Sequence, residues 1–347
     1  MTETAAAPVT ASRRRRILLV AVIAYVAMVL VVWALLRFYA DLWWPATLLL
    51  FGPRWICALP LVVLAPLAAL RDRRLLAPLA IAAIVLLFPI LGLHVALPHG
   101  SAPAPAEPTT TPPRRLRLMT YNVGEDTSNG ADLFRIMAEV SPDIVAIQEC
   151  NAIGRVATRQ PGEKYNINAH GDVCLLSRSP IERTAVEDPE AIRAIGGTGS
   201  IVRYTVHLPG GDVHLVNVHL ATVREGLTAV MQRGLGGVTT LKENMVTRWS
   251  MSAIARSFVD ATPAPVLIAG DFNLPSDSAI YRRDWAAFPS AFEEAGSGFG
   301  TSKKTRWFGV RIDHILLGAG WTCERAFIGP HLKGDHRPLV ADLTWSG

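Results

Sequence analysis

The chain of 347 residues carries little charge, and that charge is unevenly distributed. Charged residues make up 18% of it, and the net charge of +5 comes from residues 1–113, where nine arginines face four acidic residues. Residues 114–347 hold 25 basic and 25 acidic residues, so this part has no net charge. A protein that binds duplex nucleic acid is expected to have a basic surface. Nucleic acid is therefore a less favoured partner, and local patches such as Lys303-Lys304 with Arg306 are its remaining support.

Cysteine is also scarce, with four residues in the chain. Cys57 lies in a long apolar region, which leaves Cys150, Cys174 and Cys323, an odd number for an oxidising compartment. Cys150 and Cys174 lie on or beside predicted strands, so they either form a disulfide or are small buried side chains. Cysteine spacing alone does not decide between these alternatives.

A cleavable signal peptide is not indicated, although half of the residues are apolar. The first apolar segment, residues 17–36, is too long for a signal sequence, and no small-residue cleavage site precedes the next apolar block. Segments 50–70 and 75–97 are also long enough to cross a hydrocarbon core of about 30 Å. The middle one contains Pro60 and Pro66 and spans only with help from the residues before Arg54. We predict three transmembrane helices over residues 17–97.

The arginines predict the orientation of these helices. Four precede the first helix and three lie in the turn before the third, whereas the opposite loop has only Arg37 and Arg54, offset by Asp41. The positive-inside rule places the basic N-terminus, residues 1–16, in the cytoplasm. Three crossings then make this a multi-pass protein of the cell membrane with an extracytoplasmic C-terminal part. If the middle segment does not cross, that part is cytoplasmic.

A linker and one globular unit follow the predicted helices. Residues 98–113 are rich in Pro, Ala and Thr and are typical of an extended tether. Residues 114–347 are enough for a two-layer core. Strands are predicted at 116–122, 143–149, 172–178, 200–208, 212–219, 265–271, 311–317, 322–328 and 337–344. Helices are predicted at 131–140, 240–259 and 276–283. Many strands and few helices favour an α+β sandwich of two packed sheets flanked by helices.

Six polar clusters end apolar runs in this unit, which is typical of strand ends that converge on one site. They are Thr120-Tyr121-Asn122, Gln148-Glu149, Asn217-Val218-His219, Gly270-Asp271-Phe272-Asn273, Arg311-Ile312-Asp313-His314 and Gly334-Asp335-His336. Together they supply carboxylates, amides and imidazoles, which suit a hard divalent cation and proton transfer. The clusters therefore predict a metal-dependent hydrolase.

Gly270–Asn273 illustrates both the functional and the structural interpretation of such a cluster. If the strand continues, Asp271 and Asn273 face the same side, where the carboxylate can take a proton from water and the amide can hold the attacked anion. The same tetrapeptide also fits an Asp-Asn turn. Glu149 ends a buried run, where an ionised carboxylate needs a partner or a cation, although an exposed strand-end Glu is the alternative.

The histidines are ambiguous when each is taken alone. Asp313 and His314 alternate in a strand, so only one of them faces inward. His336, in a turn before the last strand, is suited to be held by a distant Asp as a proton donor or charge stabiliser. A lone strand histidine such as His219 is more often a satisfied core residue. The segment between His219 and Trp249 is either a lid or bilayer-touching segment or a kinked helix.

The motifs TYN, QE, NVHL, GDFN, RIDHIL and GDHRP, in this order, resemble the endonuclease/exonuclease/phosphatase superfamily, which includes DNase I-like nucleases, inositol-polyphosphate 5-phosphatases and neutral sphingomyelinases. The resemblance covers about residues 114–345 and implies a four-layer α/β/β/α sandwich. The NVHL cluster is similar to the DNase I, 5-phosphatase and sphingomyelinase branches, because abasic-site enzymes usually have a Tyr there. Gly334 replaces a Ser found in many members.

The resemblance also implies roles for individual residues. Mg²⁺, or alternatively Mn²⁺, is expected to bind Glu149, assisted by Asn122 and Asp335. Asp271 is expected to position or deprotonate the attacking water. The resemblance further implies that Asn273, His219 and Asn217 contact the phosphate side of the substrate, and that His336, oriented by Asp313, stabilises the transition state.

The architecture of three membrane helices followed by an external domain is similar to the VanJ-type teicoplanin-resistance membrane proteins, which are proposed to act on undecaprenyl pyrophosphate. The leading hypothesis is thus a membrane-anchored phosphoester hydrolase that acts at the bilayer on a lipid phosphate, pyrophosphate or phosphodiester, with a role in glycopeptide resistance. An external nuclease is the alternative. A non-catalytic binding module is disfavoured by the intact set of acid, amide and imidazole groups.

Overall fold

The computed structural model describes residues 9–96, 114–124, 129–150, 165–305 and 307–346. The chain divides into two compact units, Met1–Leu93 and His94–Gly347. The predicted linker, residues 98–113, lies outside the described residues, as does Arg306 of the predicted basic patch. The second unit begins at His94, earlier than the predicted boundary at residue 114, because a short strand at 94–95 pairs with a strand in the C-terminal part.

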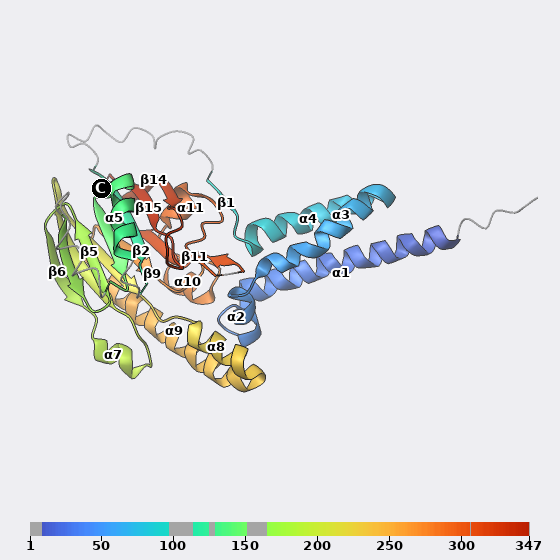
Figure 1. The fold of residues 1–347 in the computed structure, drawn as a ribbon, viewed down its shortest axis with the longest axis horizontal. Coiled ribbons are helices and arrows are strands. Elements are labelled where there is room, and N and C mark those ends of the chain that lie inside the picture. Colours follow the sequence, from blue (N-terminus) through green and yellow to red (C-terminus); the bar gives the residue numbers. More distant parts are fainter. Residues whose placement is uncertain (1–8, 97–113, 125–128, 151–164, 306, 347) are drawn as a thin grey trace, which may run out of the picture. The chain divides into compact units, whose positions relative to one another are not determined.

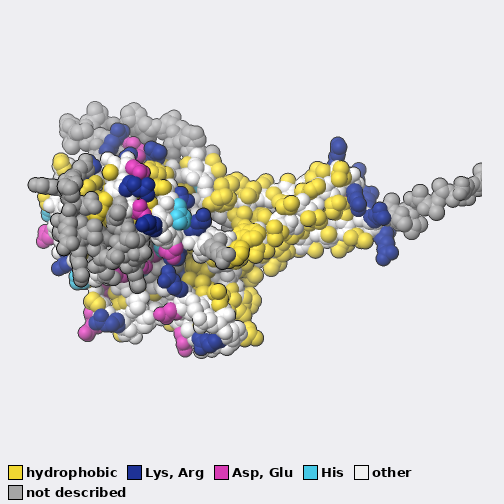
Figure 2. Space-filling view, viewed as in Figure 1, with side chains coloured by type: hydrophobic (Ala, Val, Ile, Leu, Met, Phe, Trp, Pro, Cys, Tyr) yellow, Lys and Arg dark blue, Asp and Glu magenta, His cyan; other side chains and the backbone are white. Residues whose placement is uncertain are grey.

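The first unit is entirely helical in its described residues. Its elements are α1 (Val9–Tyr39), α2 (Trp44–Leu50), η1 (Arg54–Ala58), α3 (Leu59–Arg71), η2 (Arg73–Leu75), α4 (Leu76–Val85) and the π-helical η3 (Leu86–Ile90). Among the described residues, three helical segments are long and apolar enough to cross a membrane: Arg13–Tyr39, Arg54–Arg71 and Arg73–Ile90. Hydrophobic side chains cover the surface of these helices (Figure 2).

The bounds of two predicted membrane segments need correction. The third was predicted to reach residue 97, but its helix ends at Ile90, just after Pro89, and Gly92 follows with a positive φ that favours glycine. The second does not recruit the turn before it, because α2 ends at Leu50 and a new helix starts at Arg54. Arg54 instead donates to the carbonyl oxygens of Leu50 and Ile90, where it satisfies helix C-termini.

The second unit contains all nine predicted strands. They are β2 (Arg114–Asn122), β3 (Ile144–Gln148), β5 (Val173–Ser177), β7 (Ile201–Leu208), β8 (Gly211–His219), β9 (Val266–Asp271), β13 (Asp313–Leu317), β14 (Trp321–Ile328) and β15 (Leu339–Trp345). The predictions missed β4 (Asn166–His170) and β6 (Ile181–Val186), and the two-residue strands β1 (His94–Val95), β10 (Ser297–Gly298), β11 (Lys303–Lys304) and β12 (Gly309–Val310). The missed longer strands are mostly polar and lie at sheet edges, so no apolar run marks them.

The long strands form two sheets in the described part of the chain. One has the order β14-β15-β2-β3-β5-β4 and the other β13-β9-β8-β7-β6. Each contains one parallel pair, β2–β3 and β8–β9, and the other neighbours are antiparallel. A helix connects the strands of each parallel pair: α5 (Asn129–Val140) in the first sheet and α9 (Val238–Asp260) in the second (Figure 1).

The side chains of the central strands point alternately to the two faces of each sheet. One face packs on the other sheet and the opposite face packs on helices, which gives four layers. In β9, Leu267 and Ala269 face the core between the sheets, whereas Val266 and Ile268 face the helices on the other side. The outer face of the first sheet packs on α5, and that of the second packs on α9 and α10 (Ala279–Asp284). This order of helix, sheet, sheet and helix confirms the predicted four-layer sandwich.

The remaining helices are short or form a hairpin. They are α7 (Pro189–Ala194), α8 (Arg224–Arg233), η4 (Gly234–Gly237) and α11 (Ala291–Ala295). The glycine-rich segment after His219 is thus a helical hairpin of α8 and α9 rather than a single kinked helix. Gly237 is required there, because a Cβ atom would overlap the backbone of Ala229. Met251, Ile254 and Phe258 of α9 pack on the second sheet.

Candidate active site at the strand ends

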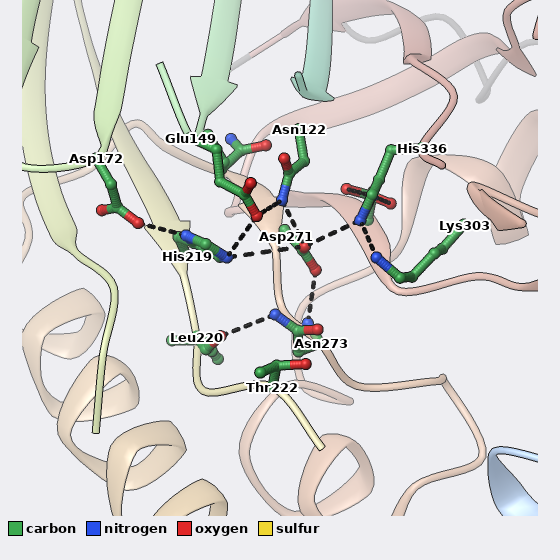
Figure 3. A network of polar contacts seen from close by, with 12 residues as sticks. Asn122, Glu149, Asp172, His219, Leu220, Thr222, Asp271, Asn273, Lys303 and His336 are labelled. Carbon is green, nitrogen blue, oxygen red and sulfur yellow. Dashed lines mark hydrogen bonds and ion pairs between the residues drawn. The ribbon is translucent and has the colours of Figure 1, made fainter. Parts of the chain in front are cut away.

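The two parallel strand pairs bring four of the six polar clusters to one place. Asn122 at the end of β2 is the register partner of Gln148 on β3, and Glu149 follows directly. In the other sheet, His219 at the end of β8 is the register partner of Asp271 on β9. Because parallel strands end at the same edge and the two sheets face each other, these side chains meet (Figure 3).

Asn122 joins the two sheets at this edge. Its Nδ2 donates to Glu149 Oε1 at 3.0 Å and to Asp271 Oδ2 at 3.0 Å, and its Oδ1 accepts the Gly124 N–H at 2.9 Å. One amide therefore holds a carboxylate from each sheet at the same point. This arrangement keeps two negative charges close together, which is costly unless a hydrogen bond or a cation stabilises them.

The backbone at two of these residues is in an unusual conformation. Glu149 and Asn273 have φ values of 57° and 51°, in the left-handed region that residues other than glycine rarely adopt. Such outliers are common at functional sites, where the surrounding structure enforces them. At Asn273 the cause is a turn, because its N–H donates to Asp271 Oδ1 at 2.9 Å. The Asp-Asn turn alternative is thus correct, and β9 ends at Asp271 rather than continuing to Asn273.

Asp271 is the buried centre of the cluster. Burial and the nearby charge of Asp313 raise its pKa, while the charges of His336 and His219 act in the opposite direction. A carboxylate with a raised pKa is a better proton acceptor than an ordinary surface Asp. Gly270 makes this position possible, because a Cβ atom there would overlap the carbonyl oxygen of Val218 on β8.

His336 and Asp313 form a buried pair beside Asp271. His336 Nδ1 donates to Asp313 Oδ2 at 2.9 Å, and His336 Nε2 lies 3.6 Å from Asp271 Oδ2. Burial opposes a charged imidazole, but the charges of Asp313 and Asp271 outweigh it and raise the pKa of His336. The same attraction lowers the pKa of Asp313 against the effect of burial. The predicted partnership of these two residues is therefore present in the structure.

His314 points away from the site, as the strand alternation requires. Its Nε2 donates to the Leu274 carbonyl at 2.8 Å, and its ring packs against Phe272 and Tyr281 on the helix-covered face of the sheet. Burial and the charge of Arg311 lower the pKa of His314 to about 3. His314 is a neutral core residue.

His219 is held by a carboxylate that the sequence analysis missed. Its Nδ1 donates to Asp172 Oδ2 at 2.5 Å, and its Nε2 lies 3.9 Å from Glu149 Oε1 and 4.0 Å from Asp271 Oδ2. Burial opposes the charged imidazole, but the hydrogen bond to Asp172 and the charge of Asp271 raise the pKa of His219 to about 9. Asp172 was missed because it precedes an apolar run, whereas the clusters were sought where runs end.

Asn217 and Gln148 are buried links between the sheets. Asn217 Oδ1 accepts from Gln148 Nε2 at 2.7 Å, and Asn217 Nδ2 donates to the carbonyl oxygens of Ile147 and Cys174. Asn217 is fully buried and its amide is committed to these partners. The expectation that it contacts substrate needs correction, because its side chain points between the sheets.

Asp335 occupies the rim of the site rather than its centre. Its Oδ2 accepts from Lys303 Nζ at 2.9 Å, and this hydrogen bond and charge lower the pKa of Asp335 against the effect of burial. Lys303 Nζ also lies 2.7 Å from His336 Nε2. The sequence predicts only a basic surface patch for Lys303, because nothing in the pair Lys303-Lys304 indicates which side chain turns inward.

Two overlapping groups of residues could hold a cation. Asp271, Asp313 and His336 offer ligand atoms within 4.8 Å of one another, but Asp313 and His336 already bond to each other and are buried. The point beside Glu149 Oε1 and Asp271 Oδ2 is more suitable, because hard divalent cations prefer carboxylate oxygens and Glu149 is partly exposed. Asn122 presents its Nδ2 at this point, so its amide would have to turn over to offer Oδ1 as a ligand. The carboxylates at this point fit the expected metal. Asp335, the third predicted ligand, contacts Lys303 instead.

The sequence profile of the endonuclease/exonuclease/phosphatase family matches residues 119–336, which include all the residues above. The chain belongs to this family. It is a hydrolase family of phosphoesterases and nucleases, and the family resemblance of the six motifs is confirmed. No curated protein matches the sequence.

Comparison with solved structures finds matches at low sequence identity. An endonuclease/exonuclease/phosphatase from Beutenbergia cavernae is 16% identical, with a TM-score of 0.47, over 67% of this chain and 72% of that one. D. rerio TDP2 complexed with a single-strand DNA product is 17% identical, with a TM-score of 0.49, over 66% of this chain and 98% of that one.

Because the folded pKa of His314 is lowered, protonation favours the unfolded chain between about pH 3 and pH 6.5, and stability falls as the pH drops through this window. We expect His314→Gln to flatten the dependence of the thermal midpoint on pH between 7.5 and 5, measured on the full chain in detergent. His331→Gln, at an exposed position, is the control. An unchanged slope in His314→Gln would contradict the buried neutral state.

Proposed function

We propose that this family member is a membrane-anchored, Mg²⁺-dependent phosphoester hydrolase whose catalytic unit lies outside the cytoplasm. Its substrate is a lipid phosphate, pyrophosphate or phosphodiester, for example undecaprenyl pyrophosphate. The proposed hydrolysis rests on one arrangement of side chains. Asn122 donates hydrogen bonds to both Glu149 and Asp271, and His219 and His336 lie on either side of Asp271. This arrangement supplies a base, two imidazole donors and an oxygen-rich cation site within one cluster.

Each residue has a distinct task in this proposal. Asp271, buried and with a raised pKa, takes the proton of the water that attacks phosphorus. His336, held by Asp313, donates to a phosphate oxygen as negative charge develops there, and His219, held by Asp172, does the same from the opposite side. Asn273 Nδ2 donates one hydrogen to the Leu220 carbonyl at 2.9 Å, and its second hydrogen can serve the phosphate.

Glu149 and Asp271 would hold the cation. Asn122 would join them if its amide turned over to present Oδ1, and Asp335 if it turned away from Lys303. When bound, Mg²⁺ supplies a positive charge that neutralises the phosphate oxygens. The left-handed backbone at Glu149 fixes the direction of its carboxylate toward Asn122. Removal of the Asn122 amide would leave the Glu149 and Asp271 carboxylates close together without the hydrogen bonds that bridge them.

Two contacts in the helical unit support the membrane location. Arg15 donates to Asp72 Oδ2 at 2.7 Å, so the arginine cluster at the start of α1 and the basic turn before α4 lie at the same end of the helical unit. This pairing is what the positive-inside rule expects for one cytoplasmic face. Arg54 binds helix carbonyls at the opposite end, near Ile90. An odd number of crossings then carries the C-terminal unit to the other side.

A disulfide supports an oxidising compartment for the catalytic unit. Cys150 and Cys174 are bonded, which chooses between the two alternatives that their spacing left open. Disulfides persist outside the cytoplasm and are rare within it. Cys150 directly follows Glu149, and its N–H donates to the Asp172 carbonyl at 3.1 Å. The bridge therefore also holds together the two segments that carry Glu149 and Asp172.

The tip of the α8–α9 hairpin favours a lipid substrate. Met231 and Leu235 are 85% and 80% exposed there, which is costly in water and favourable at a bilayer interface. The hairpin begins at Arg224, whose Nη2 lies 3.8 Å from Asp335 Oδ2 at the rim of the site. The same hairpin thus borders the site and carries apolar side chains.

The purified full chain in detergent should hydrolyse a lipid phosphoester in Mg²⁺ and lose this activity in EDTA. Asp271→Asn should lower kcat by about 10²- to 10⁴-fold, because general-base catalysis contributes about that much. Asp212→Asn, on an exposed residue at the other end of β8, should leave kcat unchanged. Undecaprenyl pyrophosphate, a phospholipid, sphingomyelin and plasmid DNA are assayed side by side. Cleavage of DNA without turnover of any lipid would support the nuclease alternative and contradict this proposal.

A reporter enzyme fused after Gly347 tests the location separately. We expect an alkaline phosphatase fusion to be active, because it folds only outside the cytoplasm, and a cytoplasmic reporter at the same position to be inactive. The reverse result would place the catalytic unit in the cytoplasm and would show that one of the three helical segments does not cross.

A further inference from the structure

Lys303 has no task in the reaction described above, although its side chain turns into the active site (Figure 3). It lies on the two-residue strand β11, which pairs with β12. Its side chain is 17% exposed, and its Nζ lies 2.9 Å from Asp335 Oδ2 and 2.7 Å from His336 Nε2. An ammonium group this buried is unfavourable unless an anion accompanies it.

The backbone fixes the direction of Lys303. The Lys304 N–H donates to the Asp335 carbonyl at 2.7 Å, and the Arg337 N–H donates to the Ser302 carbonyl at 2.6 Å. These bonds pair the segment around Lys303 with the segment around His336. Because successive side chains of a strand alternate, Lys303 faces the site and Lys304 is exposed.

A second cation approaches the same carboxylate oxygen. Arg224 Nη2, at the start of α8, lies 3.8 Å from Asp335 Oδ2. Lys303 and Arg224 thus converge on one oxygen of a side chain that is half exposed at the rim. Asp335 Oδ2 is therefore shared between two positive groups. An anion with several oxygens could replace Asp335 and contact both.

The position of this anion is determined by His336. Its Nε2 is 2.7 Å from Lys303 Nζ on one side and 3.6 Å from Asp271 Oδ2 on the other. A phosphate that faces both Asp271 and His336 therefore lies next to whatever Lys303 binds. A group covalently attached to that phosphate would reach Lys303 and Arg224 directly.

We propose that Lys303 and Arg224 form a binding site for the second phosphate of a pyrophosphate substrate, and that Asp335 fills this site when no substrate is present. This inference rests on the phosphoester hydrolysis proposed above. The oxygen of water bonds to the terminal phosphorus, and the bond from that phosphorus to the bridging oxygen breaks. The water proton goes to Asp271, and the electron pair stays on the leaving phosphate, whose charge Lys303 and Arg224 neutralise.

A site formed by Lys303 and Arg224 would distinguish a pyrophosphate from other phosphoesters. A lipid monophosphate has a single phosphate group, which the Asp271–His336 side already serves, and a phosphodiester has no second anion next to the reacting phosphorus. Only a pyrophosphate presents an adjacent phosphate to both cations. A charge-assisted contact of this kind changes binding by about 10- to 100-fold.

The test compares farnesyl pyrophosphate with farnesyl monophosphate, which share the same lipid, on the full chain in detergent with Mg²⁺. Lys303→Gln and Arg224→Gln should each lower kcat/KM for the pyrophosphate by about 10- to 100-fold and that for the monophosphate by less than about 3-fold. Lys304→Gln is the matched control, because it removes the same charge from the adjacent, exposed position. It should alter neither value by more than about 2-fold.

Equal losses on both substrates would assign Lys303 to the reacting phosphate and overturn the second-phosphate site, as would a lack of effect on either. Lys303→Arg, which keeps the charge, should recover part of the activity on the pyrophosphate. A thermal midpoint within a few degrees of the wild type shows that each variant is folded.

A binding measurement separates this inference from the proposed activity. Inorganic pyrophosphate and orthophosphate are titrated calorimetrically into Asp271→Asn in excess Mg²⁺, with and without Lys303→Gln. We expect tighter binding of pyrophosphate, and loss of that preference in Lys303→Gln. If wild-type protein hydrolyses no lipid phosphate but the preference depends on Lys303, the activity proposal fails and the site stands. If hydrolysis occurs and no preference exists, the activity stands and the site is refuted.

Discussion

The hydrogen bonds of Asn122 connect the two sheets at the place where their chemistry is concentrated. The Nδ2 atom donates to a carboxylate from each sheet, Glu149 on one side and Asp271 on the other. That bridge needs both parallel strand pairs to end at the same edge and both sheets to keep their register. The buried Gln148–Asn217 bond just beneath it joins the sheets a second time. The positions of His219, His336 and the expected cation follow from this frame.

The sequence alone predicts those parts of the site that depend on a local pattern of residues. Apolar runs with polar ends located Asn122, Glu149, Asp271 and the strands that carry them, because burial and pairing are encoded in consecutive residues. It was not sufficient for Asp172 and Lys303, whose contacts join segments far apart in the chain. Nor could it show that an amide such as Asn217 points between the sheets, since the direction of a side chain depends on the sheet that packs against it.

The helical unit and the catalytic unit have complementary roles in the proposed function. In this proposal the apolar helices keep the enzyme at a bilayer, where tethering raises the effective concentration of an insoluble substrate. The neutral charge of residues 114–347 suits an interface of this kind better than a nucleic-acid backbone. Local positive charge is instead placed at the rim of the site, on Lys303 and Arg224. We propose that this distribution selects phosphorylated lipids by their headgroup.

The most direct test of this account is a crystal structure of the catalytic unit with Mn²⁺, with the metal located by anomalous scattering. The account predicts one strong peak within coordination distance, about 2.0–2.6 Å, of Glu149 and near Asn122 and Asp271. A peak bound instead by His336 and Asp313, with Glu149 empty, would contradict the assignment of the cation site and of His336 as a phosphate donor.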